Sequence, residues 1–246
     1  MESRIMKMHF RGRVGACLAV AALAGGAATV FGAEGPAPVI VAFGDSTTAT
    51  RGALRVYSRV LREELPRQGA PVRVVNAGVG GNNTVMARKR FQKDVLDKNP
   101  AVVIVQFGIN DAAVDVWKTP PAREPRVSLA TYEANLRFFI KSIRARGAKP
   151  ILMTPNPMRW TPKLKKMYGK APYVADDKDG FNVLLKRFAA KVREIAKDEK
   201  VPLIDIYKSM ESNADELLLD GMHPNDKGQQ LVAEKLTPVV KAALEK

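Results

Sequence analysis

His223 is the only histidine beyond the first ten residues of the chain, and Asp220 precedes it by three positions. A histidine can take the proton of a serine hydroxyl, and a carboxylate can hold the imidazole in the tautomer that this requires. The spacing allows both side chains to lie on one turn, which Pro224 would close. Ser46 supplies a hydroxyl in the segment Gly44-Asp45-Ser46-Thr47. These residues indicate nucleophilic attack on an acyl group, whereas each taken alone also fits a helix N-cap or a surface turn.

Three apolar runs position further polar groups. They cover residues 39–46, 72–82 and 102–111, and each ends in a cluster of small or polar residues. Such runs are typical of buried parallel strands, whose carboxyl ends lie at one edge of the sheet. We therefore expect Ser46, Gly81 and Asn110 to lie near one another.

The blocks that contain Ser46, Gly81, Asn110 and His223 resemble, in this order, those of the SGNH or GDSL-type hydrolase superfamily. The resemblance runs from about residue 38 to the C-terminus. It implies that Ser46, Asp220 and His223 are catalytic. It also implies an oxyanion hole made of the backbone N–H groups of Ser46 and Gly81 and the side-chain amide of Asn110.

Thr47 stands where the GDSL name has leucine. A Ser-Thr pair at this place also occurs in members of the superfamily that deacetylate polysaccharides, which favours a carbohydrate substrate. Asp45, Asn76 and Asp111 also follow strands, and we expect them to orient loops rather than to react. Neighbouring Asn82 and Asn83 either contact the substrate or stabilise a turn.

The alternation of apolar runs with amphipathic stretches predicts an α/β fold. Strands are expected at 39–43, 72–76, 102–107, 150–154 and 202–206. Helices are expected at 55–68, 85–97, 129–146, 181–199 and 226–245. The predicted architecture is a three-layer α/β/α sandwich around a five-stranded parallel sheet, which is also the flavodoxin-like fold that the resemblance implies.

Two predicted connections are longer than such a fold needs, at residues 112–128 and 155–180. Long loops at the active edge commonly carry substrate selectivity, although both also fit ordinary surface insertions. The second loop contains Trp160, Tyr168 and Tyr173. We expect these flat aromatic side chains to suit sugar rings.

Residues 1–33 have the pattern of a secretory signal peptide, with a basic start, an apolar alanine-rich stretch and small residues at its end. An uncleaved membrane anchor is the alternative. Residues 34–246 are then one hydrolase domain without cysteine, because Cys17 is the single cysteine of the chain. Export without disulfides suits a bacterial periplasm or exterior. This domain contains one histidine and no cysteine, so we expect it to have no metal site and to need no cofactor.

The net charge of the chain is +15. Residues 1–33 contain four basic residues and one glutamate, so residues 34–246 carry +12. The basic residues are dispersed and match no nucleic-acid-binding module, so no nucleic-acid partner is expected. The charge fits either a well-solvated surface or attraction to an acidic polysaccharide.

These observations predict a secreted serine esterase that forms an acyl-enzyme on Ser46 and hydrolyses carboxylic esters, with O-acetyl groups on polysaccharides as the expected substrate. A lysophospholipase or thioesterase of the same superfamily is one alternative, and a non-catalytic carbohydrate-binding surface protein is another. Because the base must be uncharged to accept a proton, activity is expected to fall at acidic pH.

Overall fold

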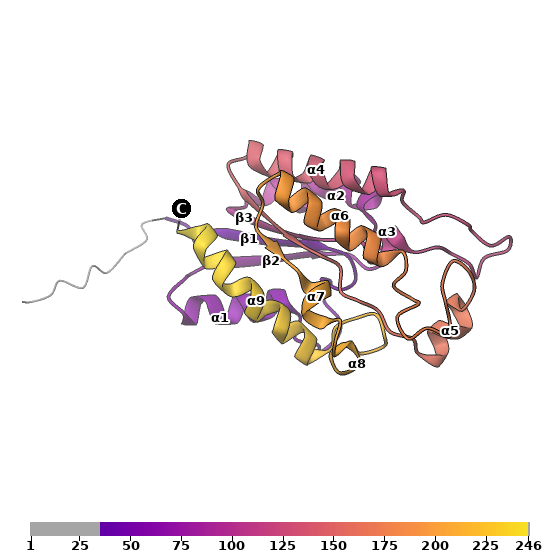
Figure 1. Cartoon of the computed structure of the whole chain (residues 1–246). Coiled ribbons are helices and arrows are strands. Elements are labelled where there is room, and N and C mark those ends of the chain that lie inside the picture. Colours follow the sequence, from indigo (N-terminus) through magenta and orange to yellow (C-terminus); the bar gives the residue numbers. More distant parts are fainter. Residues whose placement is uncertain (1–34, 246) are drawn as a thin grey trace, which may run out of the picture. The chain divides into compact units, whose positions relative to one another are not determined.

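A computed structural model describes residues 35–245, which contain a five-stranded, fully parallel sheet in the order β2-β1-β3-β4-β5 (Figure 1). The strands are β1 (Val39–Gly44), β2 (Arg73–Gly78), β3 (Val102–Gln106), β4 (Lys149–Met153) and β5 (Leu203–Ile204). The predicted α/β fold is therefore confirmed. The predicted signal peptide, residues 1–33, lies outside the described residues.

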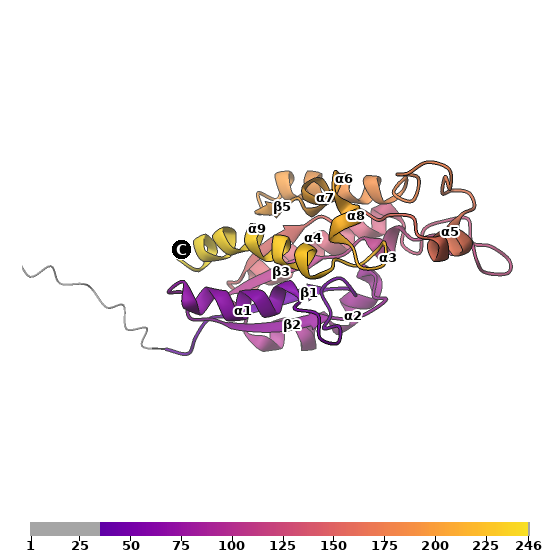
Figure 2. The ribbon, with the colours of Figure 1, turned by 90° about the horizontal axis from the view of Figure 1, so that it is seen from below.

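Helices cover both faces of the sheet. The longer helices are α1 (Tyr57–Arg67), α2 (Thr84–Asp94), α4 (Leu129–Ala145), α6 (Leu185–Asp198) and α9 (Asp226–Leu244). Helices α1 and α9 lie side by side on one face, and α2, α4 and α6 cover the other (Figures 1 and 2). The three-layer arrangement predicted from the sequence is thus present, with each long helix within a few residues of its expected bounds.

The sheet has a hydrophobic core on each face, and successive side chains of a strand point alternately into the two cores. Val41 and Phe43 of β1 face the layer of α2, α4 and α6, whereas Ile40 and Ala42 face α1 and α9. Both sets are fully buried, as expected for a central strand covered on both faces.

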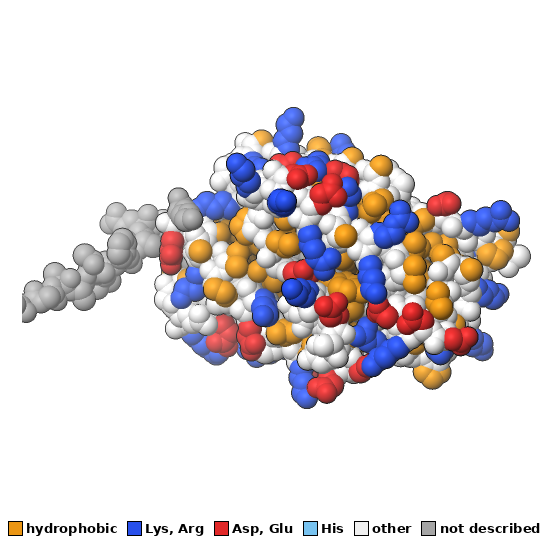
Figure 3. Space-filling view, in the orientation of Figure 1, with side chains coloured by type: hydrophobic (Ala, Val, Ile, Leu, Met, Phe, Trp, Pro, Cys, Tyr) orange, Lys and Arg blue, Asp and Glu red, His pale blue; other side chains and the backbone are white. Residues whose placement is uncertain are grey.

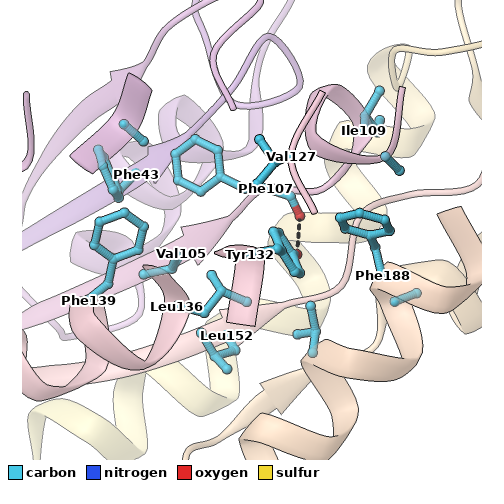
Figure 4. Packing of buried hydrophobic residues seen from close by; sticks show 14 of the residues in the cluster. Phe43, Val105, Phe107, Ile109, Val127, Tyr132, Leu136, Phe139, Leu152 and Phe188 are labelled. Carbon is cyan, nitrogen blue, oxygen red and sulfur yellow. Dashed lines mark hydrogen bonds between the residues drawn. The ribbon is translucent and has the colours of Figure 1, made fainter. Parts of the chain in front are cut away.

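Aromatic side chains fill the core beneath α4. Phe43 packs edge-on against Phe107 and Phe139, and the Tyr132 hydroxyl donates a hydrogen bond of 2.8 Å to the Phe107 carbonyl oxygen (Figure 4). This bond satisfies the buried hydroxyl and attaches α4 to the end of β3.

Short helical elements connect the strands and the long helices. They are η1 (Leu96–Lys98), α3 (Ile109–Ala112), α5 (Pro162–Tyr168), α7 (Ile206–Met210) and α8 (Ala214–Leu217). The expected strand at 202–206 is shorter than predicted, because the Asp205 side chain accepts a hydrogen bond from Lys208 N and begins α7. The expected loop at 155–180 contains α5, which is capped by the Thr161 side chain and has Pro162 as its first residue.

Charged residues of both signs are interspersed over the face shown in Figure 3, without a single large basic patch. Within residues 35–245, no helix is both long enough and apolar enough to span a bilayer.

Candidate active site

Ser46, His223 and Asp220 form a continuous hydrogen-bonded chain. The Ser46 Oγ lies 2.9 Å from His223 Nε2. On the other side of the ring, His223 Nδ1 lies 2.8 Å from Asp220 Oδ2 and 3.0 Å from Oδ1. A serine hydroxyl, a base and an orienting carboxylate at these distances can generate a nucleophile. The structure thus brings together three residues that the sequence separates by up to 177 positions.

The turn that carries Asp220 and His223 is built by Asp220 itself. Its Oδ1 accepts hydrogen bonds from the backbone N–H groups of Met222 and His223, at 3.1 and 3.0 Å. Gly221 has φ +83°, a conformation that side chains rarely adopt. Asn225 then caps α9, its side chain accepting a hydrogen bond from Gly228 N. One carboxylate therefore both shapes the turn and orients the imidazole.

Asp220 remains a carboxylate more readily than an ordinary aspartate. Partial burial acts against its charged form, but the hydrogen bonds from the His223 backbone and ring outweigh this effect and lower the pKa of Asp220. Arg51 lies 3.7 Å away and adds a weaker cationic contact. A carboxylate in this state can stabilise an imidazolium.

The residues on either side of Ser46 hold the serine at the end of β1. Asp45 Oδ1 accepts hydrogen bonds from the Thr47 N–H and hydroxyl, at 2.8 and 2.9 Å. The same hydroxyl reaches Gln106 Oε1 of β3, and Gln229 of α9 donates to the Thr47 carbonyl oxygen. Ser46 therefore sits in a turn attached to the sheet and to the last helix, and Asp45 acts on the turn, as expected.

Gly81 lies after β2 with φ +74°, and a Cβ at this position would meet no atom within 4 Å. The requirement for glycine here is therefore one of backbone conformation. Within residues 35–245, the backbone N–H groups of Ser46 and Gly81 donate no hydrogen bond. Both remain available to a substrate.

Asn110 is the second residue of α3, which follows β3, and it is buried, with 9% of its surface exposed. Its Nδ2 donates to the Asn82 carbonyl oxygen at 3.1 Å, which uses one of the two amide hydrogens. Its Oδ1 accepts a hydrogen bond of 3.3 Å from Arg126 Nη1. The second amide hydrogen is thus left for the Asp45 carboxylate, which the amide helps to keep charged, or for a bound oxyanion.

Three further polar residues expected at the strand ends act on the loops. Asn76 receives the Gly78 N–H and donates to the Thr48 carbonyl oxygen. Asn83 caps α2 by accepting from Met86 N. Asp111 Oδ1 accepts both the N–H and the hydroxyl of Thr84.

Burial changes the acidity of two carboxyl groups next to the site. Burial raises the pKa of Asp45 despite the hydrogen bonds from Thr47. Burial also raises the pKa of Asp111 to about 7, against the opposing hydrogen bonds from Thr84, and the negative charge of Asp45 raises it further. Asp111 Oδ2 has no hydrogen-bond partner in the described chain, which fits a group that carries a proton near neutral pH.

Sequence reasoning did not identify Arg90, Arg126 and Asn156. Arg90 of α2 donates to the carbonyl oxygens of Gly44 and Ala77 and to Asn82 Oδ1. Buried Asn156 donates to the Met222 carbonyl oxygen beside His223. The two arginines are among 40 Lys and Arg residues, and no motif spacing marks any of the three.

A cleft of about 500 Å³ adjoins Gly81 on the side of α2 and α4. The expected long loop at 112–128 forms much of its wall. The lining consists mostly of polar and charged side chains, contributed by Asn83, Asp115, Lys118, Glu124 and Arg126, together with Gly81, Met86 and Ala122.

The expectation that the aromatic residues of the 155–180 loop offer faces to sugar is wrong for Tyr168 and Tyr173. Their exposed fractions are 9% and 6%, and both rings pack against Phe181. Trp160 stacks on the same Phe181 at a centroid distance of 4.4 Å. The loop has a small aromatic core of its own, because burying these rings stabilises a long insertion more than exposing them would.

Among residues 35–245, no group of three or more His, Cys, Asp or Glu side chains is arranged to hold a metal ion.

A flavodoxin-like sheet with a serine, a histidine and an aspartate in contact at its carboxyl edge defines a hydrolase of the serine type. Residues 42–231 match the GDSL-like Lipase/Acylhydrolase family, and the chain belongs to this family. It is accordingly a carboxylic ester hydrolase, and the superfamily inferred from the four sequence blocks is confirmed.

Several known proteins are similar to this chain. The Bacillus subtilis protein named uncharacterized lipoprotein YqeF is 32% identical over 216 residues, which cover 79% of this chain and 86% of YqeF. An acetylxylan esterase of Geobacillus stearothermophilus is 28% identical over 173 residues, 66% of this chain and 69% of the esterase. The crystal structure of a lipase/acylhydrolase from Enterococcus faecalis superimposes with a TM-score of 0.64 at 27% identity, covering 83% and 96% of the two chains.

Proposed function

We propose that this protein is an exported serine esterase that removes short acyl groups, above all acetyl, from hydroxyl groups of a polysaccharide. The observation that carries the proposal is the contact of 2.9 Å between Ser46 Oγ and His223 Nε2, with Asp220 on the opposite ring nitrogen.

In this mechanism, Ser46 Oγ attacks the ester carbonyl carbon while His223 Nε2 takes the hydroxyl proton. The N–H groups of Ser46 and Gly81 and the Asn110 Nδ2 donate to the oxygen that becomes negative. His223 then gives its proton to the alcohol oxygen, and the alcohol leaves. A water molecule, deprotonated by His223, attacks the acyl-enzyme and releases the acid, which regenerates the Ser46 hydroxyl.

The cleft beside Gly81 supports a short acyl group. His223 must reach the alcohol oxygen, and its turn leads into α9 on one face of the sheet. The cleft lies on the other face, with the oxyanion donors between, so it is open to the acyl side of a bound ester. A long alkyl chain there would desolvate Lys118, Glu124 and Arg126, which costs free energy. An acetyl group would bury far less of this charged surface.

Similarity supports a carbohydrate as the alcohol part. The Geobacillus relative is an acetylxylan esterase, and the Ser46-Thr47 pair fits the same preference. Export is supported by the signal-like residues 1–33 and by the lipoprotein named among the relatives. The function proposed for residues 34–246 is thus deacetylation outside the cytoplasm.

Hydrolysis of p-nitrophenyl esters from acetate to palmitate by the full chain, compared with Ser46→Ala, tests the proposal. We expect activity to be highest on acetate and to fall by at least about 10³-fold in the variant, because the attacking group is lost. Activity that rises with chain length would instead support a lysophospholipase or thioesterase. If both proteins were inert on every ester, a carbohydrate-binding role without catalysis would replace the proposal.

A further inference from the structure

The side-chain amide of Asn110 can serve the oxyanion only in one of its two orientations. Its oxygen and nitrogen ends have nearly the same shape, but only the Nδ2 end donates hydrogen bonds. A flipped amide would turn the Oδ1 acceptor towards the developing negative charge. Some neighbouring group must therefore distinguish the two ends.

Two hydrogen bonds, together with the Asp45 carboxylate, favour the orientation in which Nδ2 is the donor. The Asn82 carbonyl oxygen accepts from Nδ2 at 3.1 Å, and Arg126 Nη1 donates to Oδ1 at 3.3 Å. In the flipped orientation, Oδ1 would face the Asn82 carbonyl oxygen and Nδ2 would face the guanidinium, so both contacts would become repulsive. A cation on Oδ1 also polarises the amide and strengthens Nδ2 as a donor.

The Arg126 guanidinium is itself held by a carboxylate, that of Asp115. Asp115 Oδ1 accepts from Arg126 Nε at 3.0 Å and from Nη2 at 2.6 Å, which leaves Nη1 directed to Asn110. The Asp115 side chain is only 7% exposed, and Lys118 contacts its other oxygen at 2.7 Å. Burial alone would raise the pKa of Asp115, but the bonds from Arg126 and Lys118 lower it. The guanidinium is therefore fixed by a buried carboxylate rather than by a surface pair.

We propose that Arg126, clamped by Asp115, is a positioning residue that orients the Asn110 amide towards the oxyanion. The proposal rests on the oxyanion role proposed above for Asn110. It assigns a function to the long loop between α3 and α4, which carries both members of the clamp and forms the wall of the cleft.

A double-mutant cycle on the full chain tests this proposal, with p-nitrophenyl acetate as the substrate. We expect Asn110→Ala to lower kcat by about 100- to 1,000-fold, as for the loss of one oxyanion donor. Arg126→Ala should lower kcat by about 10- to 100-fold with KM changed less than about threefold, since its effect is exerted in the transition state. In the Asn110→Ala background, Arg126→Ala should cost less than about threefold more, because the group that it orients is gone.

Equal losses of kcat from Arg126→Ala in the two backgrounds would overturn the proposal, as would a loss confined to KM. Arg123→Ala, on the same loop, is the matched control and should keep the activity of the unmodified chain. If Arg126→Ala does not fold, Arg126→Lys takes its place: it keeps the cation but not the forked contact, so its smaller loss of kcat must also vanish without Asn110. An Asn110→Ala variant with full kcat would refute the oxyanion assignment itself, whatever Arg126 does.

Discussion

Asp111 shows how a single buried carboxyl group can connect the site to the stability of the protein. It joins the segment after β3 to the first residue of α2 through Thr84, and it is fully buried. Its pKa of about 7 lies well above the ordinary value of 3.8, chiefly because burial disfavours the charged form. In the unfolded chain the group is exposed and loses its proton at much lower pH.

The free energy of unfolding should therefore fall as the pH rises from about 4 to 7. In this window the folded protein holds a proton on Asp111 that the unfolded chain has lost, so stability decreases by at most roughly 1.4 kcal/mol per pH unit. Asp111→Asn removes this titration while its Oδ1 can still accept from Thr84. Urea unfolding at pH 5 and pH 8 should show the variant gaining stability relative to the unmodified chain at pH 8.

Asp97→Asn is the control for that comparison. Asp97 is exposed, so this variant also removes a carboxyl group, but one that is not buried. If the unmodified chain and Asp111→Asn kept the same difference in unfolding free energy at both pH values, the raised pKa of Asp111 would be contradicted.

At the scale of the secondary-structure elements, α2 holds the ends of β1 and β2 in place through Arg90. Arg90 in its second turn donates to the last residue of β1, to Ala77 of β2 and to the loop residue Asn82, and it forms an ion pair with Asp94 at 3.1 Å. Its guanidinium also lies over the ring of Phe43, 4.7 Å from the centroid. Helix α2 therefore links the loops of Ser46 and Gly81.

Replacement of Arg90 by alanine should weaken both stability and catalysis. Carbonyl oxygens of two strands and one side-chain amide lose a charged donor, which should cost about 2–4 kcal/mol of unfolding free energy. The Gly81 loop should also become looser, so kcat on p-nitrophenyl acetate should fall. Urea unfolding and steady-state kinetics measure the two effects. Lys89→Ala replaces the neighbouring exposed residue and should change neither the unfolding free energy nor kcat. If Arg90→Ala also left both unchanged, the linking role of α2 would be disproved.

At the scale of the whole molecule, the high positive net charge bears on which substrates the protein attracts. Residues 34–246 carry +12, and on the face shown in Figure 3 the charged groups are dispersed rather than gathered. A field of this kind attracts a polyanion from a distance and is screened by salt, without contacts to any one group.

If an acidic polysaccharide is the substrate, kcat/KM on an acetylated polyuronate should fall several-fold between about 0.02 and 0.5 M NaCl, because the Debye length shortens from roughly 20 Å to 4 Å. Acetylated xylan, which is neutral, serves as the matched substrate and should show little dependence on salt. Initial rates of acetate release measure both. The same salt response on the two polymers would refute steering by the net charge.

Much of the fold could be predicted because its signals are local. The continuous apolar runs around Val41 and Val103 follow from burial on both faces, and each long helix is marked by its own periodicity. The site residues Ser46 and Asn110 were recognisable because each lies within a few residues of the end of such a strand, and Asp220 and His223 because they share one turn. Arg90, Arg126 and Asn156 were not predictable, since their partners lie 8 to 66 residues away along the chain.

The sequence by itself determined the layers, the order of the site blocks and the chemistry available at the sheet edge. These depend on the apolar period and on residue types, which neighbouring positions express. Only the tertiary structure decided that Arg126 contacts Asn110, that Asp111 is buried beside Asp45, and that Tyr168 and Tyr173 turn inward. Each of these depends on distance and solvent exclusion between segments far apart in the chain, and hydrogen bonding and burial act through space rather than along the sequence.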